Sequence, residues 1–251
     1  MTLPKSRILL PLYIYPERGA WDPLFEAVVP NPTLDFVIIV NPNSGPGSEP
    51  WWPNAEYVRE IPRLNAHQNV RTVGYVSTAY CKRPIEKVLA DVDRYAAWSC
   101  DERFPGLAVD GIFFDETPNV FSEKAKEYLD AITAHVKRTG GLLGENMVVH
   151  NPGTSVDIRF ASPGLDIATV AELAYADFKT TECQEWLATS PFSRDKSCYM
   201  IYAVPEEVLE EFVARDLRNI AEYIFVTDRK TDVYNAFGAS WTSFVGALAD
   251  S

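Results

Sequence analysis

Short apolar runs recur along the whole chain and alternate with longer amphipathic segments. Eight runs are apolar throughout, without regular polar alternation, which is typical of strands buried on both faces of a parallel sheet. These expected strands are Ile8–Ile14, Phe36–Asn41, Val70–Ser77, Gly111–Asp115, Asn146–Asn151, Ile167–Glu172, Cys198–Ala203 and Tyr223–Thr227. The pattern therefore predicts a parallel sheet with helices on its faces.

Between these runs lie segments whose apolar residues have helical spacing. The expected helices are Tyr57–Asn65, Ile85–Trp98, Glu123–Lys137, Glu206–Asn219 and Phe237–Ala249. About eight strand–helix units in 251 residues predict an α/β fold, a single (β/α)8 barrel spanning residues 1–251. An open doubly wound sheet is the alternative, although no GxGxxG or GxxxxGK[ST] motif follows a strand.

The charge of the chain narrows the choice of partners. Its net charge is −12, from 35 acidic and 23 basic residues, so it repels phosphate backbones, and we expect no nucleic-acid partner. A neutral or cationic ligand fits better, although the acidic surplus also serves solubility. No run of about 18 apolar residues is present, so no membrane segment is expected. The apolar start resembles a first strand more than a signal peptide, which predicts a cytoplasmic location by default.

Cysteine and histidine spacing argues against metal and nucleophile motifs. The four cysteines form no CxxC pair, and we favour free thiols while leaving disulfides open. The three histidines, His67, His135 and His150, lack metal-ligand spacing. No GxSxG motif is present either. We therefore expect no metal and no cofactor, which leaves acid–base chemistry by carboxylates.

Acidic residues stand at the carboxyl ends of two expected strands. Asp115 and Glu116 end GIFFDE, and Glu172 ends the sixth strand. Catalytic groups of barrels gather at these strand ends. Because strand side chains alternate, Asp115 and Glu116 share one direction only if the strand has already ended. We predict that Asp115 and Glu172 form the working pair across the barrel mouth, with Glu116 third. Helix capping, or the start of the next helix, is the alternative for these acids.

Other strand ends carry aromatic, amide and hydroxyl groups. Aromatic rings suit the apolar faces of sugars, and amides and hydroxyls suit sugar hydroxyls, so a carbohydrate site is predicted. The expected substrate-binding residues are Tyr13, Tyr15, Asn41, Asn43, Tyr75, Tyr80, His150, Asn151 and Tyr202. The loop Pro42–Pro53, with Trp51 and Trp52, forms a binding wall or a structural Ω-loop, and Trp241 is a further aromatic candidate.

Several of these segments together resemble the spherulin-4-like, or spherulation-specific, family. They are ILLPLYIYP, VIIVNPNSGPG, VGYVSTAY, VDGIFFDE, NPGT and the strand that ends at Glu172, in that order between about residues 8 and 175. The resemblance implies a (β/α)8 barrel and an endo-acting glycoside hydrolase of α-1,4-linked N-acetylgalactosamine stretches in galactosaminogalactan. It also implies that Asp115, Glu116 and Glu172 are the family's acids. Fungal members are often secreted or anchored, whereas this chain shows no such signal.

The leading hypothesis is hydrolysis of an amino-sugar polysaccharide or oligosaccharide by a chain that we expect to be monomeric. Asp115 is the expected nucleophile or stabilising carboxylate, Glu172 the general acid/base, and Glu116 a substrate-binding group. An N-acetyl group of the substrate, oriented by Asp115, is an alternative nucleophile. One competing hypothesis is a non-catalytic carbohydrate-binding or spore-associated barrel. Another is a lyase or isomerase, but the last loop has no Gly-rich phosphate site.

Overall fold

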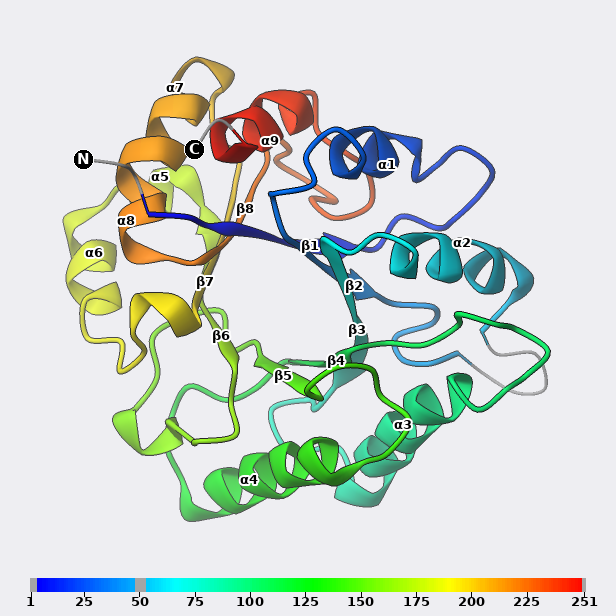
Figure 1. The fold of residues 1–251 in the computed structure, drawn as a ribbon. Coiled ribbons are helices and arrows are strands. Elements are labelled where there is room, and N and C mark those ends of the chain that lie inside the picture. The colour runs from blue at the N-terminus through cyan, green and yellow to red at the C-terminus, as the bar shows by residue number, and fades with distance from the viewer. Residues whose placement is uncertain (1–3, 48–52, 250–251) are drawn as a thin grey trace.

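Eight parallel strands close into a barrel in their order along the chain, as Figure 1 shows. The computed structural model describes residues 4–47 and 53–249. The strands are β1 (Arg7–Leu12), β2 (Phe36–Val40), β3 (Val70–Ser77), β4 (Gly111–Asp115), β5 (Met147–His150), β6 (Ile167–Ala174), β7 (Ser197–Tyr202) and β8 (Tyr223–Val226). The predicted (β/α)8 barrel is therefore confirmed, and strand ends differ from prediction by at most two residues.

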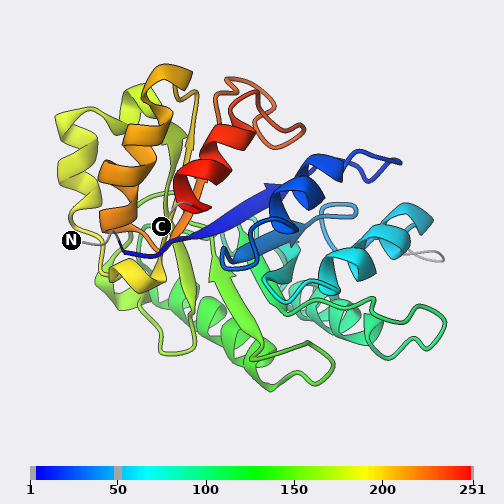
Figure 2. The same cartoon turned by 45° about the horizontal axis from the view of Figure 1, so that its top comes forward.

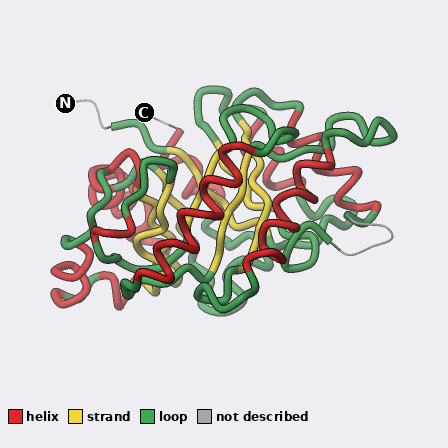
Figure 3. Tube along the Cα trace, turned by 90° about the horizontal axis from the view of Figure 1, so that it is seen from below, coloured by secondary structure: helices red, strands yellow, loops and turns green. Residues whose placement is uncertain are grey.

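Helices surround the barrel, with the strands inside them in Figures 2 and 3. The α-helices are α1 (Asp22–Val28), α2 (Ala55–Asn65), α3 (Ile85–Trp98), α4 (Glu123–Arg138), α5 (Tyr175–Phe178), α6 (Thr181–Leu187), α7 (Glu206–Glu211), α8 (Arg218–Ile220) and α9 (Trp241–Ala249). The short 3-10 helices η1 (Ile158–Phe160) and η2 (Arg194–Lys196) and the π-helical turn η3 (Phe212–Leu217) complete the layer.

The helical layer departs from the predicted pattern in three places. The chain between β5 and β6 forms only η1 and loops, so one barrel unit lacks its α-helix. The expected helix Glu206–Asn219 is continuous in space but passes through the π-helical turn. Helices α1, α5 and α6 are too short to show a periodic apolar stripe, and the sequence pattern did not predict them.

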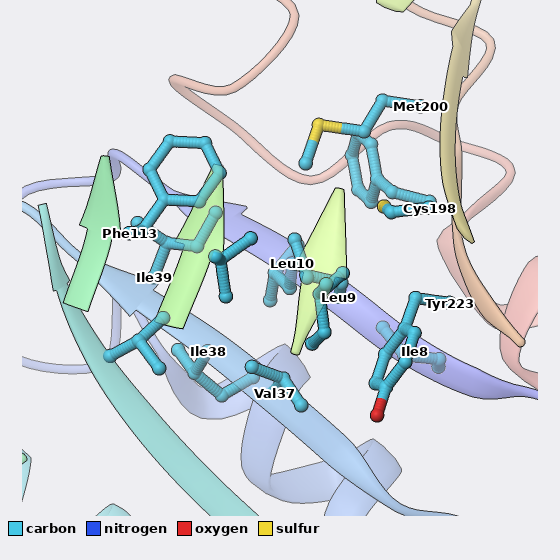
Figure 4. Packing of buried hydrophobic residues seen from close by; sticks show 14 of the residues in the cluster. Ile8, Leu9, Leu10, Val37, Ile38, Ile39, Phe113, Cys198, Met200 and Tyr223 are labelled. Carbon is cyan, nitrogen blue, oxygen red and sulfur yellow. The ribbon is translucent and has the colours of Figure 1, made fainter. Parts of the chain in front are cut away.

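The barrel interior is filled by side chains from alternate strand positions. Figure 4 shows part of the buried hydrophobic cluster, in which neighbouring positions such as Leu9 and Leu10 lie on opposite faces of a strand. Leu9, Val37, Phe113 and Cys198 are almost completely buried. The first position of β4 must be glycine, because a Cβ on Gly111 would lie 2.1 Å from the carbonyl oxygen of Met147 on β5. The close approach lets β4 carry Phe113 and then Asp115 inward at the carboxyl end of the barrel.

Both ends of the described chain are held by a buried cation. Arg218, 2% exposed, donates from Nη2 to the Pro4 carbonyl at 2.9 Å and from Nη1 to the Ala247 carbonyl at 3.5 Å. The two ends accordingly lie near α8 and α9 in Figure 1. This contact joins the residue Pro4 before β1 to the last turn of α9, and so it ties the two ends of the described chain together.

Candidate active site

Asp115 stands at the end of β4 and accepts three hydrogen bonds. The Tyr75 hydroxyl donates to Oδ2 at 2.8 Å, and the Asn151 amide donates to Oδ1 at 2.8 Å. The backbone N–H of Glu116 also donates to Oδ1, at 2.8 Å. Three neutral donors stabilise a carboxylate anion at a fixed position. Burial, with the nearby Asp115 charge, raises the pKa of Tyr75, so the phenol keeps its proton for this bond.

Glu172 lies on β6, and a strand irregularity turns its side chain into the mouth. Residues Thr169 and Glu172 pair with Cys198 and Met200, with a register shift between Thr169 and Ala171. Cys198 and Met200 are two residues apart and share one face, so Thr169 and Glu172 share it too, although they are three residues apart. A β-bulge of this kind re-aims a side chain at the rim of a barrel.

The Glu172 carboxyl is held at both oxygens and is largely shielded from water. The Tyr234 hydroxyl donates to Oε1 at 2.6 Å, and the Asn151 amide donates to Oε2 at 2.7 Å. Burial raises the pKa of Glu172 above its ordinary value of 4.5, and the Asp115 charge adds to the rise, against the opposing effect of these two hydrogen bonds. A raised pKa suits a group that must hold a proton before it gives one away.

Asn151 connects the two carboxylates through one nitrogen. Its Nδ2 lies 2.8 Å from Asp115 Oδ1 and 2.7 Å from Glu172 Oε2, so these oxygens are separated by at most the sum, 5.5 Å. With the roughly 120° between the two N–H bonds of an amide, the separation is about 4.8 Å. At this separation, the two carboxyl groups leave no room for an attacking water molecule between one of them and the sugar.

Glu116 leaves the strand pattern and turns back toward β3. Its φ of +54° is in the left-handed region, and the Ser77 hydroxyl donates to its Oε2 at 2.5 Å. Its carbonyl accepts the backbone N–H of Tyr80 and the hydroxyl of Thr78. The strand has therefore ended at Asp115, which was the condition for both acids to face the mouth. A non-glycine residue in this conformation is strained, and such strain is concentrated at functional sites.

Aromatic rings surround this network. Tyr13, which follows β1, packs edge-on against Tyr75 and Tyr234 with ring centroids 5.7 Å and 5.5 Å away. Tyr202 ends β7, on the face that Met200 occupies and beside Ala174 of β6. Within residues 4–47 and 53–249, no ion pair involves Asp115, Glu116 or Glu172, so their hydrogen-bond partners there are neutral groups.

Two predicted binding residues lie away from the carboxylates. His150 points outward: its Nε2 lies 3.1 Å from the Thr133 hydroxyl of α4, and burial lowers its pKa to about 4. The expectation that it lines the mouth is wrong, because strand alternation gives that face to Asn151. Tyr15, 45% exposed, donates to Glu56 and accepts from Asn54 at the start of α2, at the outer end of the β1 loop.

The remaining predicted groups shape loops around the mouth. Asn41 Oδ1 accepts the backbone N–H of Gly45 and so closes the turn after β2. Asn43 is exposed on that turn. Tyr80 is 57% exposed, with a φ of +55°, and only its backbone N–H bonds to Glu116. These three positions are near the rim, but none of their side chains reaches the carboxylate network in the contacts that the structure gives.

Of the three candidate tryptophans, the described residues include only Trp241. Trp241 is 7% exposed in α9 and donates to the Pro23 carbonyl, so it belongs to the outer core instead of the mouth. Trp51 and Trp52 lie outside the described residues. Sequence reasoning missed Tyr234, which comes from the loop after β8. Its only signal was its place at the carboxyl end of a barrel strand, the criterion that selected the other groups.

No group of three His, Cys, Asp or Glu side chains in the described part of the chain is arranged to hold a metal ion. No helix of that part is long and apolar enough to cross a membrane. All four cysteines are free thiols, as favoured from their spacing.

Known proteins resemble this chain over nearly its full length. The family model Spherulin4, spherulation-specific family 4, matches residues 7–248, well beyond the segments that carried the resemblance in the sequence. The structure of Aspergillus clavatus Sph3 in complex with GalNAc is similar with 43% identity and a TM-score of 0.93, covering 98% of each chain. No sequence among the curated proteins matches.

More distant structures share the barrel. A β-glucuronidase from Ruminococcus gnavus matches 98% of this chain and 50% of its own, with 9% identity and a TM-score of 0.57. A Bacteroidetes-affiliated GH5 cellulase matches 98% of this chain and 90% of its own, with 10% identity and a TM-score of 0.54. At such identities the likeness shows the fold alone.

Proposed function

The chain belongs to spherulation-specific family 4, and we propose that it is a glycoside hydrolase of amino-sugar polysaccharides. The proposed substrate resembles galactosaminogalactan, with α-1,4-linked N-acetylgalactosamine. The GalNAc complex of Aspergillus clavatus Sph3 supports a galactosamine-containing ligand. An acidic mouth held by neutral donors also tolerates a partly deacetylated, cationic polymer.

One observation carries the reaction type, namely the two carboxylates bridged by Asn151. Their facing oxygens are separated by at most 5.5 Å, as the two amide hydrogen bonds require. Retaining glycosidases use carboxyl groups about 5–5.5 Å apart, whereas inverting enzymes need roughly 6.5–9.5 Å for a water molecule. The separation supports hydrolysis with retention of the anomeric configuration.

The environments of the two acids support different roles. Asp115, anchored by three donors, attacks the anomeric carbon as the scissile C–O bond breaks. Glu172, whose pKa is raised by burial, gives its proton to the leaving oxygen and then takes one from the water that opens the glycosyl–enzyme bond. Glu116 binds the sugar beside them, with Tyr13, Tyr75 and Tyr202 as aromatic walls.

The test is incubation with a defined panel of polymers and mass analysis of the products. The panel contains α-1,4-linked N-acetylgalactosamine, its deacetylated form and chitin. We expect oligosaccharides from the first, and loss of their release in Asp115→Ala and Glu172→Ala. Near-normal turnover in both variants contradicts the carboxylate mechanism. Binding without released oligosaccharides supports the non-catalytic barrel instead.

The stereochemistry is tested separately, by NMR of the first product formed. Retention is expected with Asp115 as the nucleophile. The alternative nucleophile, the substrate acetamido group, lies cis to the leaving oxygen of an α-linked N-acetylgalactosamine and cannot attack the anomeric carbon from the opposite face, so a deacetylated substrate should also be cleaved with retention. Inversion contradicts the assignment from the carboxylate separation.

A further inference from the structure

The loop between β8 and α9, the orange-red segment beside α9 in Figure 2, is closed at its base by one side-chain clasp. Asp228 and Ser240 stand at its two ends. The Ser240 hydroxyl and backbone N–H both donate to Asp228 Oδ1, at 2.8 Å and 3.2 Å, and the Asp228 N–H donates to the Ser240 hydroxyl at 3.1 Å. Ser240 is 1% exposed. The clasp fixes the two ends of the excursion formed by residues 229–239, because Asp228 and Ser240 are 12 positions apart in the chain.

A glycine makes the clasp sterically feasible. A Cβ on Gly238 would lie 2.0 Å from Asp228 Oδ1 and 2.6 Å from the hydroxyl oxygen of Thr227. No real Cβ approaches polar atoms so closely, so another residue at position 238 would open the clasp or displace the loop. The loop therefore has one built-in conformation at its base.

The tip of the loop is also held, and it presents one side chain to the active site. Arg229 donates from Nε to the Asp232 carbonyl at 3.2 Å and from Nη2 to the Thr231 carbonyl at 3.4 Å. Tyr234 follows this turn. Its ring packs against Tyr13 at 5.5 Å and against Phe225 of β8 at 5.8 Å, so the ring is enclosed from two sides.

The hydroxyl of Tyr234 ends on Glu172 Oε1, 2.6 Å away. A phenol hydroxyl donates to a carboxylate and, after rotation about its C–O bond, accepts from a carboxylic acid. It therefore stays bonded to Glu172 in both protonation states without any movement of the ring. Burial raises the pKa of Tyr234, so the phenol keeps the proton that this exchange requires.

We propose that Tyr234 is a positioning residue that orients the Glu172 carboxyl through both steps of hydrolysis, and that the Asp228–Ser240 clasp serves to hold Tyr234 there. This inference rests on the proposed function. Tyr234 acts through Glu172, and the clasp acts through Tyr234. The order of dependence is what an experiment can test.

The kinetic test uses Tyr234→Phe, Ser240→Ala and the double variant on an α-1,4-linked N-acetylgalactosamine oligosaccharide. Tyr234→Phe should lower kcat about 10- to 100-fold with KM changed less than about threefold, because one positioning hydrogen bond is lost and no substrate contact is. The alkaline limb of its kcat–pH profile should move to higher pH, because the hydrogen bond that is lost lowers the pKa of Glu172 in the wild-type chain. Tyr199→Phe, a buried tyrosine on the outer side of β7 against Phe178, is the matched control.

The double variant tests the order of dependence. Ser240→Ala should lower kcat less than Tyr234→Phe, and the double variant should match Tyr234→Phe alone, because a clasp that acts only through Tyr234 has nothing left to hold. A wild-type kcat and pH profile in Tyr234→Phe overturns the proposal. Full additivity of the two substitutions overturns the role of the clasp.

A readout that needs no turnover separates this inference from the proposed function. The carboxyl ¹³C signal of Glu172 in protein labelled at glutamate is identified by its loss in Glu172→Gln and is titrated in wild type and Tyr234→Phe. A titration midpoint at higher pH in Tyr234→Phe supports the contact even if no polymer is cleaved. Identical midpoints overturn the proposal, whatever the activity of the wild-type chain.

Discussion

Asn151 offers the sharpest test of the carboxylate pair, because a single nitrogen touches both acids. Asn151→Ala removes the donors 2.8 Å from Asp115 and 2.7 Å from Glu172 and nothing else from the network. The amide Oδ1 is buried and has no hydrogen-bond partner among the described residues. The substitution removes this unsatisfied acceptor, but it also leaves two carboxyl oxygens without their amide donor, so some loss of stability should accompany the loss of activity.

The magnitude follows from charge and distance. When both acids are ionised, their oxygens about 4.8 Å apart repel by about 3.5 kcal/mol at an effective dielectric constant of 20. Each hydrogen bond from the amide to a charged oxygen contributes about 1.5–3 kcal/mol against that repulsion. Part of this is equal in the ground and transition states, and we take about 3 kcal/mol as the catalytic share. That corresponds to a roughly 10²-fold loss of kcat/KM.

The assay is kcat/KM across a pH series, with thermal melting of the same samples. Loss of the amide should also move the alkaline limb to higher pH, because the Asn151 bond opposes the raised pKa of Glu172. Asn219→Ala is the control, because among the described residues this exposed amide donates only to the Arg215 carbonyl one turn earlier. A kcat/KM within about threefold of wild type and an unshifted limb refute the reasoning.

Three further predictions concern stability. Glu172→Gln should melt at a higher temperature than wild type at pH 7, and the difference should shrink toward pH 4. The reason is that the folded pKa of Glu172 is raised, so the folded wild-type protein loses stability as pH rises above 4.5 and the unfolded chain ionises first. The Tyr234 hydroxyl can accept a hydrogen bond from the new amide. The folded pKa of His150 is about 4, compared with its ordinary value of 6.5, so the unfolded chain binds the proton first as pH falls. The free energy of unfolding should therefore drop by roughly 3 kcal/mol between pH 6.5 and pH 4. Denaturant titrations of His150→Gln should show a flatter dependence on pH. Arg218→Met should lower the free energy of unfolding by about 2–4 kcal/mol in urea titrations without changing kcat/KM, because the Pro4 and Ala247 carbonyls lose their donor far from the carboxylates.

The apolar runs predicted the strands because strands buried on both faces leave a strong local signal. The structure has all eight; Asp115 ends β4, and Glu172 lies in the last part of β6, which continues to Ala174. The same local reasoning failed for His150. Alternation along β5 was available in the sequence and would have separated His150 from Asn151, since neighbouring strand residues face opposite sides.

Tyr234 was out of reach for a different reason. Its partner Glu172 is 62 residues earlier in the chain, and the loop between β8 and α9 has no periodic pattern that indicates where its side chains point. Its position depends on Gly238 and on the Asp228–Ser240 clasp, which are tertiary contacts. Pair contacts of this kind are not encoded in any one segment, so the sequence indicated an acidic mouth without the groups that orient it.

Besides Asp115, the acids Glu116 and Glu172 are placed by interruptions of regular strand geometry. Perfect alternation from Asp115 would send Glu116 outward, and perfect alternation from Thr169 would send Glu172 outward. A left-handed residue ends β4 in the first case, and a bulge shifts β6 in the second. Each irregularity lowers the stability of its strand, through backbone strain or lost pairing, and the barrel fold itself does not require either of them. Because both breaks bring a carboxylate to the same place, the barrel geometry was shaped by the site, and regular strand rules fail at the positions where the chemistry is proposed.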